Sequence, residues 1–513
     1  MLRPTRPTRP FALAGGTLFV LFILLTFGLH APLREKAGAL ISRPHHDTQS
    51  EHTFNSKLHI LLPASNAAVD MCKTLLTGSM LGYPIPTLIA WNESHNQGHL
   101  LGGGSHVAKI SRVLEYLEKM PTSQDNELIF MMDAYDIWFQ LPPEVLISRY
   151  YMINRKANQR LRTRLGNAYD AEHIRQTIIF GAGKRCAPNQ MHTVACYPIP
   201  DSPLPDDLYG SNTDTVMGKN KYTSQKQRYL NSGYIIGPLG DMRKMFKRAW
   251  EKVEATHDHD EWDNGSHGSD FMYHGSDQSI FNIMWGEQEF QREVLRRRHL
   301  GVIDRMLGRG KPLSHHIEST LVEDPLNPPF THQPMEHKEG RPDEFGIGVD
   351  YFSDLGHQTV NTEDDTKYLT YENDVAEQLK DRKGIFDCPP RVTGQLPQDV
   401  LQTTPPSSVE KTWAQLPLFT NVCLNTIPVM IHHNGDKGAR SWQWPIAWMQ
   451  SHARRTFEQV LGDEQNVRAS GKSTGGAYLP SGQHLSFQEL CPQNYEYELF
   501  RDVEKPEHEP PGF

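Results

Sequence analysis

Two aspartates follow an apolar run at positions where they could bind a metal ion. Asp133 and Asp136 come directly after Phe130–Met132 and are three residues apart. Ligands of open α/β sheets bind beyond the carboxyl ends of the strands. Two carboxylates there can share a hard divalent cation, which also takes the oxygens of a diphosphate. The pair therefore predicts a metal site, and the alternative is a turn that caps a helix expected after Pro142.

A second apolar run, 428–431, ends in the sequence His432, His433, Asn434 and Gly435, with Lys437 just beyond it. A neutral imidazole can be a third metal ligand, and a lysine can face a phosphate. The chain contains 25 histidines, however, so most of them must be ordinary surface or capping residues. This motif alone is a weak indication of function.

Three further clusters have both a chemical and a structural interpretation. The glycines 102–104 precede an expected helix and could let the backbone approach a phosphate, or could form a plain turn. Asn231 enters a strand-like run and could hold a sugar hydroxyl, or make an Asx turn. Asp277 opens an expected helix, where it could face a reaction centre or serve only as a cap.

The elements that would position these residues alternate between apolar runs and helical periodicity. This alternation predicts an α/β fold with a largely parallel sheet flanked by helices. Expected strands are 58–63, 88–91, 127–132, 177–180, 234–237 and 428–431. Expected helices are 71–81, 107–120, 142 to about 151, 241–256 and 444–461. Residues 257–274 are expected to form a polar loop.

The first 33 of the 513 residues predict a membrane anchor. Residues 11–29 contain no charge, and about 20 apolar residues suffice for a helix to cross a bilayer. Arg3, Arg6 and Arg9 precede this segment, so the positive-inside rule leaves the N-terminus in the cytosol and the rest in a lumen. The alternative is a cleaved signal peptide, with 37–39 as the cleavage site.

The resulting organisation has five parts. We expect a cytosolic tail (1–10), a single-pass type II anchor (11–33), a stem (34–56) and a head (57–460), followed by a C-terminal extension (461–513) whose end from Pro506 is disordered. Within the head, residues from about 300 to 413 are less regular and are interpreted as an insertion with some helix.

Composition limits the possible partners and the compartment. The formal charge of −9 argues against a generally basic nucleic-acid binder, so no nucleic-acid partner is expected. The six cysteines would lie in an oxidising lumen and permit up to three disulfides. Cys186 and Cys196 are the closest pair and the expected one, whereas the pairing of the others is undetermined.

The order of the motifs suggests a family. The chain contains 102-GGG-104, 133-DAYD-136, 180-FGAGKRCAP-188, 230-LNSG-233, 277-DQSIF-281 and 432-HHNG-435 in this sequence. This series resembles the glycosyltransferase domain of the procollagen lysyl hydroxylase and procollagen galactosyltransferase group. That domain has a GT-A-type (Rossmann-like) fold with a mixed sheet, and the series is also similar to its fungal-type membrane-anchored relatives. The resemblance covers roughly residues 58–300 and 415–450.

The resemblance implies a nucleotide-sugar donor, most often a UDP-hexose, and Mn²⁺ (or Mg²⁺) as the cofactor. Carried over by position, the metal ligands would be Asp133, Asp136 and His432, and Asn231 and Asp277 would face the donor sugar and the reaction centre. The residues that would lie near the nucleotide and its diphosphate are Gly103, Gly104, Lys109, Asp133 and Lys437.

The chain also departs from the family pattern. His433 stands where the family usually has glycine, and 273–276 replaces an acidic run before Asp277. The expected function is a Golgi (or ER) hexosyltransferase that moves a sugar to a hydroxyl of a glycan or glycoprotein. The altered run favours an alternative, a non-catalytic membrane-tethered carbohydrate-binding or scaffold protein. A lumenal metallohydrolase is a third hypothesis, but it lacks a dense ligand motif.

Overall fold

A computed structural model describes most of the chain after the expected stem. The described residues are 57–95, 104–189, 191, 193–210, 222–257, 276–307, 344–380, 388–462 and 475–503. They belong to a compact unit that begins at Lys57. None of the helices described there is long and apolar enough to cross a bilayer. The expected anchor at 11–33, the stem, Gly103, nearly all of the expected loop 257–274 and the tail from Pro506 lie outside the described residues.

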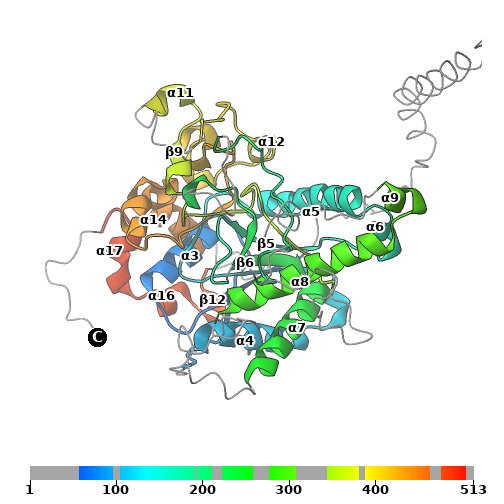
Figure 1. Cartoon of the computed structure of the whole chain (residues 1–513). Coiled ribbons are helices and arrows are strands. Elements are labelled where there is room, and N and C mark those ends of the chain that lie inside the picture. The colour runs from blue at the N-terminus through cyan, green and yellow to red at the C-terminus, as the bar shows by residue number, and fades with distance from the viewer. Residues whose placement is uncertain are drawn as a thin grey trace, which may run out of the picture. The chain divides into compact units, whose positions relative to one another are not determined.

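The central element is a mixed eight-stranded sheet in the order β13-β12-β2-β1-β3-β6-β5-β7 (Figure 1). Strands β12, β2, β1 and β3 are mutually parallel, as are β5 and β7, whereas β6 is antiparallel to both of its neighbours. The strands are β1 (Leu58–Pro63), β2 (Thr87–Ile89), β3 (Leu128–Met132), β5 (Ile178–Gly183), β6 (Tyr229–Pro238), β7 (Ile347–Val349), β12 (Ala477–Tyr478) and β13 (His484–Leu485). The expected α/β class with a largely parallel sheet is confirmed.

Strand β3 shows why the sheet is central. Its side chains are buried on both faces, and they alternate between two hydrophobic clusters as the pleat requires. Leu128, Phe130 and Met132 join one cluster, whereas Ile129 and Met131 join the other. A continuous apolar run is the pattern of a strand that is covered on both sides.

Helices cover both faces of the sheet (Figure 1). Apolar residues of α4, α7 and α8 belong to one cluster, and those of α3, α5 and α14 belong to the other. The longer helices are α3 (Val69–Met80), α4 (Ser105–Lys119), α5 (Pro143–Leu165), α7 (Leu239–His257), α8 (Asp277–Arg298) and α14 (Trp448–Gly462). The shorter ones are α6 (Asn167–Ala171), α9 (Val302–Met306), α11 (Val375–Gln378), α12 (Gln398–Leu401), α13 (Ala439–Gln443), α16 (Phe487–Leu490) and α17 (Glu496–Leu499).

Two small sheets complete the described structure. One has the order β4-β11-β8, with β11 antiparallel to β4 and parallel to β8. The other pairs β10 with β9 in antiparallel fashion. Their strands are β4 (Ile137–Phe139), β8 (Gly356–Gln358), β9 (Thr366–Leu369), β10 (Leu418–Asn421) and β11 (Met430–His432).

Two elements are longer than the sequence predicts. Helix α5 does not end near Tyr151 but continues to Leu165. Its second half contains many charged residues, yet Ile153, Ala157 and Leu161 are buried at a spacing of four, which is enough for one helical face. Strand β6 begins at Tyr229, ahead of the expected run at 234–237, because its polar residues pair with β5.

The segment interpreted as an insertion is part of the fold. Its strand β7 extends the main sheet beside β5, and β8 pairs with β11 in the small sheet. The C-terminal extension is likewise integrated, because β12 pairs with β2 at the other edge of the main sheet. Short strands separated by polar residues escaped sequence analysis, since each has too few residues for an alternating pattern to stand out.

Three disulfides join the described cysteines. The expected pair Cys186–Cys196 is present. Cys72–Cys491 ties α3 to the residue after α16, across a sequence separation of 419, and Cys388–Cys423 closes a shorter loop. These two pairs link segments whose proximity no local pattern reveals.

Candidate functional site

The turn between β3 and β4 brings the two sequence-predicted aspartates together. Asp133 follows the last residue of β3, and its backbone N–H donates to the carbonyl of Gly233 on β6 at 2.8 Å. Asp136 precedes β4, the first strand of the small sheet. The chain therefore passes from the main sheet to the small sheet through these residues, at the edge where the parallel strands end.

Strand β11 adds His432 to this turn. His432 is the register partner of Ile137 on β4, and the backbone N–H of His433 donates to the Asp136 carbonyl at 2.7 Å. The Nε2 atom of His432 consequently lies 3.8 Å from Asp133 Oδ2 and 3.6 Å from Asp136 Oδ2. One ligand atom from each of the three residues lies within 4.8 Å of the others. The structure thus brings together the three residues that we expected to hold a metal.

Several polar atoms of this group have no internal partner. Both ring nitrogens of His432, which is 1% exposed, and Oδ1 of Asp136 are buried without a hydrogen bond to any described residue. Unsatisfied buried polar atoms are costly and uncommon in native proteins. Together with the carboxylate of Asp133, of which Oδ1 accepts a hydrogen bond from Lys109, these atoms form a donor set suited to a divalent cation.

A close contact explains a glycine in this site. A Cβ atom added to Gly233 would lie 1.9 Å from Cε1 of His432. That separation is far below any van der Waals contact, so only glycine leaves room for the imidazole beside β6. Gly233 thereby sets the position of His432 from the opposite sheet.

A second group of charges lies beside the three candidate ligands. Lys109 Nζ on α4 lies 2.8 Å from Asp133 Oδ1 and 2.9 Å from Asp277 Oδ2 at the start of α8. It also donates to the Ser232 carbonyl at 3.2 Å. His106, one turn earlier on α4, has Nδ1 3.4 Å from Asp277 Oδ1. The ammonium group of Lys109 therefore joins Asp133, a candidate metal ligand, to Asp277, the candidate catalytic aspartate.

Asn231 connects the start of β6 to α8. Its side-chain amide donates to Gln278 Oε1 at 3.0 Å, and its Oδ1 accepts the backbone N–H of Gly233 at 3.0 Å. Gln278 follows Asp277 in the first turn of α8. Asn231 thus holds two of the site's elements together. Its bond to the N–H two residues later is the Asx-turn contact that the sequence offered as the alternative to a contact with a sugar.

The charges of the site shift the pKa values of its acids in different directions. Burial raises the pKa of Asp133 above its usual range, against the effect of Lys109 and together with that of Asp136. Burial would also raise the pKa of Asp277, but Lys109 and His106 outweigh it and hold that pKa far below its usual range. Asp277 is therefore a carboxylate at neutral pH, and its attraction to Lys109 is retained there.

Arg440 on α13 binds the two segments that carry the candidate ligands. Its guanidinium donates to Asp70 Oδ2 at 2.7 Å and to the carbonyls of Tyr135 and His433 at 2.9 and 3.1 Å, and it lies 3.8 Å from Asp136 Oδ2. It therefore fixes both the aspartate turn and the histidine loop. Arg440 and Lys109 supply two positive charges. The carboxylates of Asp133, Asp136 and Asp277, when ionised, supply three negative charges.

His433, which stands where the family usually has glycine, packs against an aromatic side chain. Its ring is 1% exposed and lies 3.9 Å, centroid to centroid, from the buried ring of Trp138. Burial, with a contribution from Arg440, lowers its pKa to about 3. A neutral His433 fills space between the small sheet and its neighbours.

Gly104 and Lys437 are the remaining predicted residues that the structure describes. Gly104 is the N-cap of α4 with a φ of 88°, a conformation that favours glycine. Lys437 is exposed in the turn before α13, and its ammonium has no ion-pair partner in the described part of the chain. Sequence analysis missed His106 and Arg440. His106 lies one turn before Lys109, which was a usable signal, whereas nothing local distinguishes Arg440 from other arginines.

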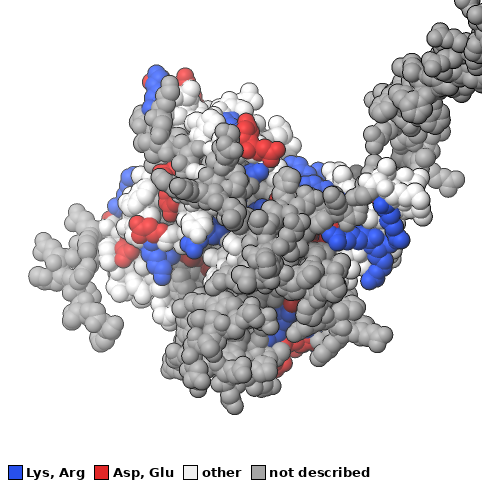
Figure 2. All heavy atoms as spheres, viewed as in Figure 1, with Lys and Arg blue, Asp and Glu red and all other residues white. Residues whose placement is uncertain are grey.

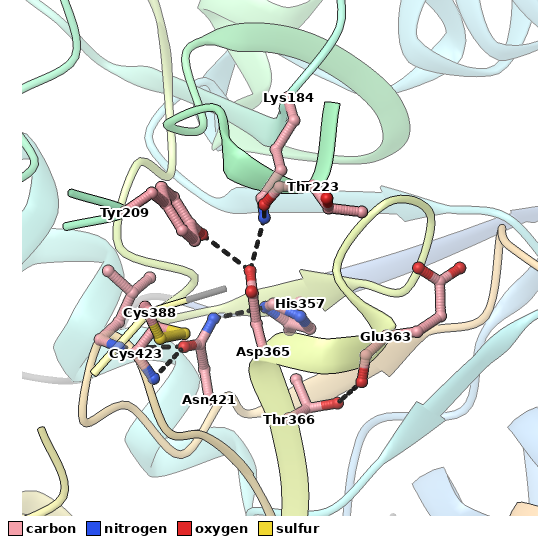
Figure 3. Close-up of a disulfide and its surroundings, with 11 residues drawn as sticks. Lys184, Tyr209, Thr223, His357, Glu363, Asp365, Thr366, Cys388, Asn421 and Cys423 are labelled. Atoms are coloured by element: carbon pink, nitrogen blue, oxygen red, sulfur yellow. Dashed lines mark hydrogen bonds and ion pairs between the residues drawn. A yellow bond between two sulfur atoms is a disulfide. The ribbon is translucent and has the colours of Figure 1, made fainter. Parts of the chain in front are cut away.

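Another group with suitable ligand spacing lies elsewhere in the fold. Asp365, Cys388 and Cys423 each offer a ligand atom within 4.8 Å of the others. Figure 3 shows that the two sulfur atoms are joined, and that Lys184 and Tyr209 converge on Asp365. Their distances to Asp365 Oδ2 are 2.6 and 2.7 Å. This group is saturated by its own partners and does not fit a metal.

Comparison with known proteins adds no relative to this description. No protein-family model matches the chain, and a search of curated proteins finds no significant match.

Proposed function

We propose that this chain is a metal-dependent glycosyltransferase with a GT-A-like head, which transfers a hexose from a nucleotide sugar, UDP-hexose in the first instance, to a hydroxyl of a glycan or glycoprotein. The observation that supports it is the convergence of Asp133, Asp136 and His432 at the ends of two strands, with unpartnered ligand atoms, beside the pair formed by Lys109 and Asp277.

The candidate ligands fit a manganese ion. Manganese accepts carboxylate oxygens, and imidazole nitrogen is a common additional ligand of first-row transition metals. The donor atoms come from a turn and a strand held by backbone pairing, so the protein supplies them without reorganisation. When bound, the ion would neutralise charge on the departing nucleotide diphosphate.

The residues of the chain would position the reactants. In the transfer, the acceptor oxygen would form a bond to the anomeric carbon as the bond from that carbon to the diphosphate oxygen breaks. The diphosphate would leave with the electron pair of that bond, and the proton of the acceptor hydroxyl would pass to the departing diphosphate or to water. Asp277, ionised and held by Lys109, is placed to accept a hydrogen bond from the sugar or to stabilise positive charge on it. Lys109 and Asn231 act by holding α4, β6 and α8 in fixed positions relative to one another.

The proposed setting is the lumen of the Golgi (or ER), with residues 11–33 as a type II anchor. Three disulfides in the described head support an oxidising compartment. The uncharged run 11–29 supports the anchor.

The test uses calorimetry to measure the binding of Mn²⁺ and of UDP to the full-length chain in detergent. We expect Mn²⁺ to bind, UDP to bind in its presence, and Asp136→Asn and His432→Ala each to weaken Mn²⁺ binding by at least about 100-fold. Asp364→Asn, an acid outside the site, is the control and should bind normally. Equal Mn²⁺ affinity in all four proteins would overturn the metal assignment.

Activity is then measured by a screen of UDP- and GDP-sugars for hydrolysis or transfer with Mn²⁺. A second candidate function, nucleotide-sugar or glycan binding without transfer, is favoured by one observation: the Asp277 carboxylate is already engaged by Lys109 and His106. Mn²⁺-dependent UDP binding with no turnover of any donor would select this second candidate. Turnover that Asp277→Asn abolishes would exclude it.

A further inference from the structure

A cavity of about 250 Å³ lies between α5 and α8, apart from the residues of the candidate metal site. Its wall includes Leu161 and Leu165 of α5, Trp285 of α8 and Tyr351, which follows β7. These groups are apolar or aromatic. Pockets that are mostly apolar, with a few well-placed polar groups, are typical of small-molecule sites. Such pockets usually have volumes of about 300–1,000 Å³, so this slightly smaller cavity suits a small ligand.

The charged part of the wall consists of three arginines, Arg160, Arg164 and Arg292, and three acids, Asp201, Glu289 and Glu293. Two of the arginines are paired with acids. Arg292 is bidentate to Glu344, at 2.7 and 2.6 Å, and also contacts Glu289 at 2.5 Å. Arg164 contacts Glu289 at 2.5 Å as well. The two guanidinium groups therefore engage both oxygens of Glu289 and both oxygens of Glu344.

Arg160 is the third arginine. It is half-buried and forms no ion pair with any acid of the described chain. Its guanidinium carbon lies 5.8 Å from the centroid of the Tyr351 ring. Burial, and repulsion by Arg164, lower the pKa of Arg160. A guanidinium held beside another cation and an aromatic ring is a place where an anion would be stabilised.

A second donor has no acceptor either. The indole N–H of Trp285 is buried without a hydrogen-bond partner among the described residues, although the rest of the ring is packed. Figure 2 shows Lys and Arg side chains gathered at the edge of the molecule where α5, α6 and α9 lie in Figure 1. The cavity wall therefore presents an indole N–H without an acceptor among the described residues, and a guanidinium group, that of Arg160, without an ion pair there.

We infer that this cavity binds a small organic carboxylate, with the carboxylate on Arg160 and an apolar body against Trp285, Tyr351 and Leu161. A carboxylate suits the site better than inorganic phosphate, because a phosphate dianion loses more hydration on entering apolar surroundings. The inference does not depend on the proposed transferase activity, since the cavity and the metal site share no lining residue.

The test uses benzoate as the probe and the full-length chain in detergent, with calorimetry at ligand concentrations up to roughly ten times a Kd of about 1 mM. Benzamide is the uncharged isostere, and phosphate is the anion without an apolar body. We expect saturable one-to-one binding of benzoate, and binding of the other two at least about tenfold weaker.

Variants locate the site. Arg160→Ala and Arg160→Gln should each weaken benzoate binding about tenfold or more, and thermal unfolding should show that at least one of them is folded. Arg155→Ala, an exposed arginine on the same helix, is the matched control and should bind normally. Asp136→Asn should also bind benzoate normally. No saturable binding of benzoate, equal binding of benzamide, or normal benzoate affinity in a folded Arg160 variant would each overturn the inference.

Discussion

Two groups of three potential metal ligands occur in the described structure, and their surroundings differ. In the first, formed by Asp133, Asp136 and His432, both ring nitrogens of His432 and Oδ1 of Asp136 are buried without a hydrogen-bond partner among the described residues, and Asp133 is bound through one oxygen by Lys109. In the second, Asp365 is bound by Lys184 and Tyr209, and the two cysteines are bonded to each other. Ligand spacing is alike in both, so spacing alone does not distinguish a binding site from a structural cluster.

The difference lies in which groups the protein has already satisfied. The Lys184 side chain is 0% exposed, and its ammonium also donates to the Thr223 carbonyl at 2.6 Å. A buried ion pair of this kind holds segments in place, but the carboxylate oxygen that forms it is not available to a metal ion. At the first group, backbone pairing and Arg440 hold the segments that carry the ligand atoms. The ring nitrogens of His432 and Oδ1 of Asp136 have no hydrogen-bond partner among the described residues, so they can bind a ligand.

The largest expected effect separates the two groups by stability. Asp365→Ala should lower the free energy of unfolding by about 3–5 kcal/mol, because it leaves the charge of Lys184 buried without a partner. Asp136→Asn should change the free energy of unfolding by less than about 1 kcal/mol, since replacing a functional residue often costs little stability. Denaturant unfolding of the full chain measures both.

The neighbouring acid provides the control for this comparison. Asp364→Ala should change the free energy of unfolding by no more than about 0.5 kcal/mol. A loss for Asp136→Asn as large as that for Asp365→Ala would mean that both groups are structural. The contrast between them would then disappear.

The disulfide of the second group supplies the next effect. Replacing Cys388 and Cys423 together by serine should cost about 2–4 kcal/mol, because the unfolded chain regains the freedom of the loop that the disulfide closes. Mn²⁺ affinity, measured by calorimetry, should stay unchanged. Weaker Mn²⁺ binding in the double variant would show that the second group also shapes the metal site.

A contact at Gly233 tests the first group without touching a ligand. Gly233→Ala would force the imidazole of His432 to move, so Mn²⁺ affinity should fall about 10- to 100-fold, as it does when groups that orient metal ligands are changed. Gly78→Ala is the control, because its added Cβ has no neighbour nearer than 3.7 Å. Calorimetry with Mn²⁺ compares the two variants, and an equal affinity would refute the role of Gly233.

The sequence predicted the parts of this site that depend on local pattern. The apolar run before Asp133 and the run before His432 each indicated a strand that ends in polar groups, and both strands are present. The pairing of β11 with β4, which brings the two runs together, joins residues almost 300 positions apart. Only the resemblance to a family suggested this proximity, because no periodicity carries information over such a distance.

Features that depend on tertiary context were not predictable in the same way. Lys109 bridges two acids from different elements. The ion pair of Asp365 depends on Lys184, which directly follows β5. The strands in 300–413 were missed because three or four residues give too short a pattern. Burial and pairing decide these features, and both arise only when distant segments meet.

The smallest expected effect is a pH dependence from His357, which lies within the second group's surroundings. Its ring nitrogens lie 3.1 Å from Ser353 Oγ and 3.0 Å from Thr362 Oγ1, and burial, with the charge of Lys184, lowers its pKa to about 3. Unfolded histidine has a pKa of about 6.5. Below pH 6.5 the unfolded chain binds this proton and the folded chain does not, so stability is lost as the pH falls towards 3.

Between pH 6 and 4 this single group should therefore make the wild-type free energy of unfolding fall by up to about 1.4 kcal/mol per pH unit more than that of His357→Gln. Subtracting the two curves removes the other titrating groups, which both proteins share. His484→Gln, at an exposed histidine, should leave the slope as in the wild type. Equal slopes in wild type and His357→Gln would mean that the folded protein protonates His357 as readily as the unfolded chain does. The second group would then admit charge and water, and its contrast with the metal site would have to rest on the disulfide and Lys184 alone.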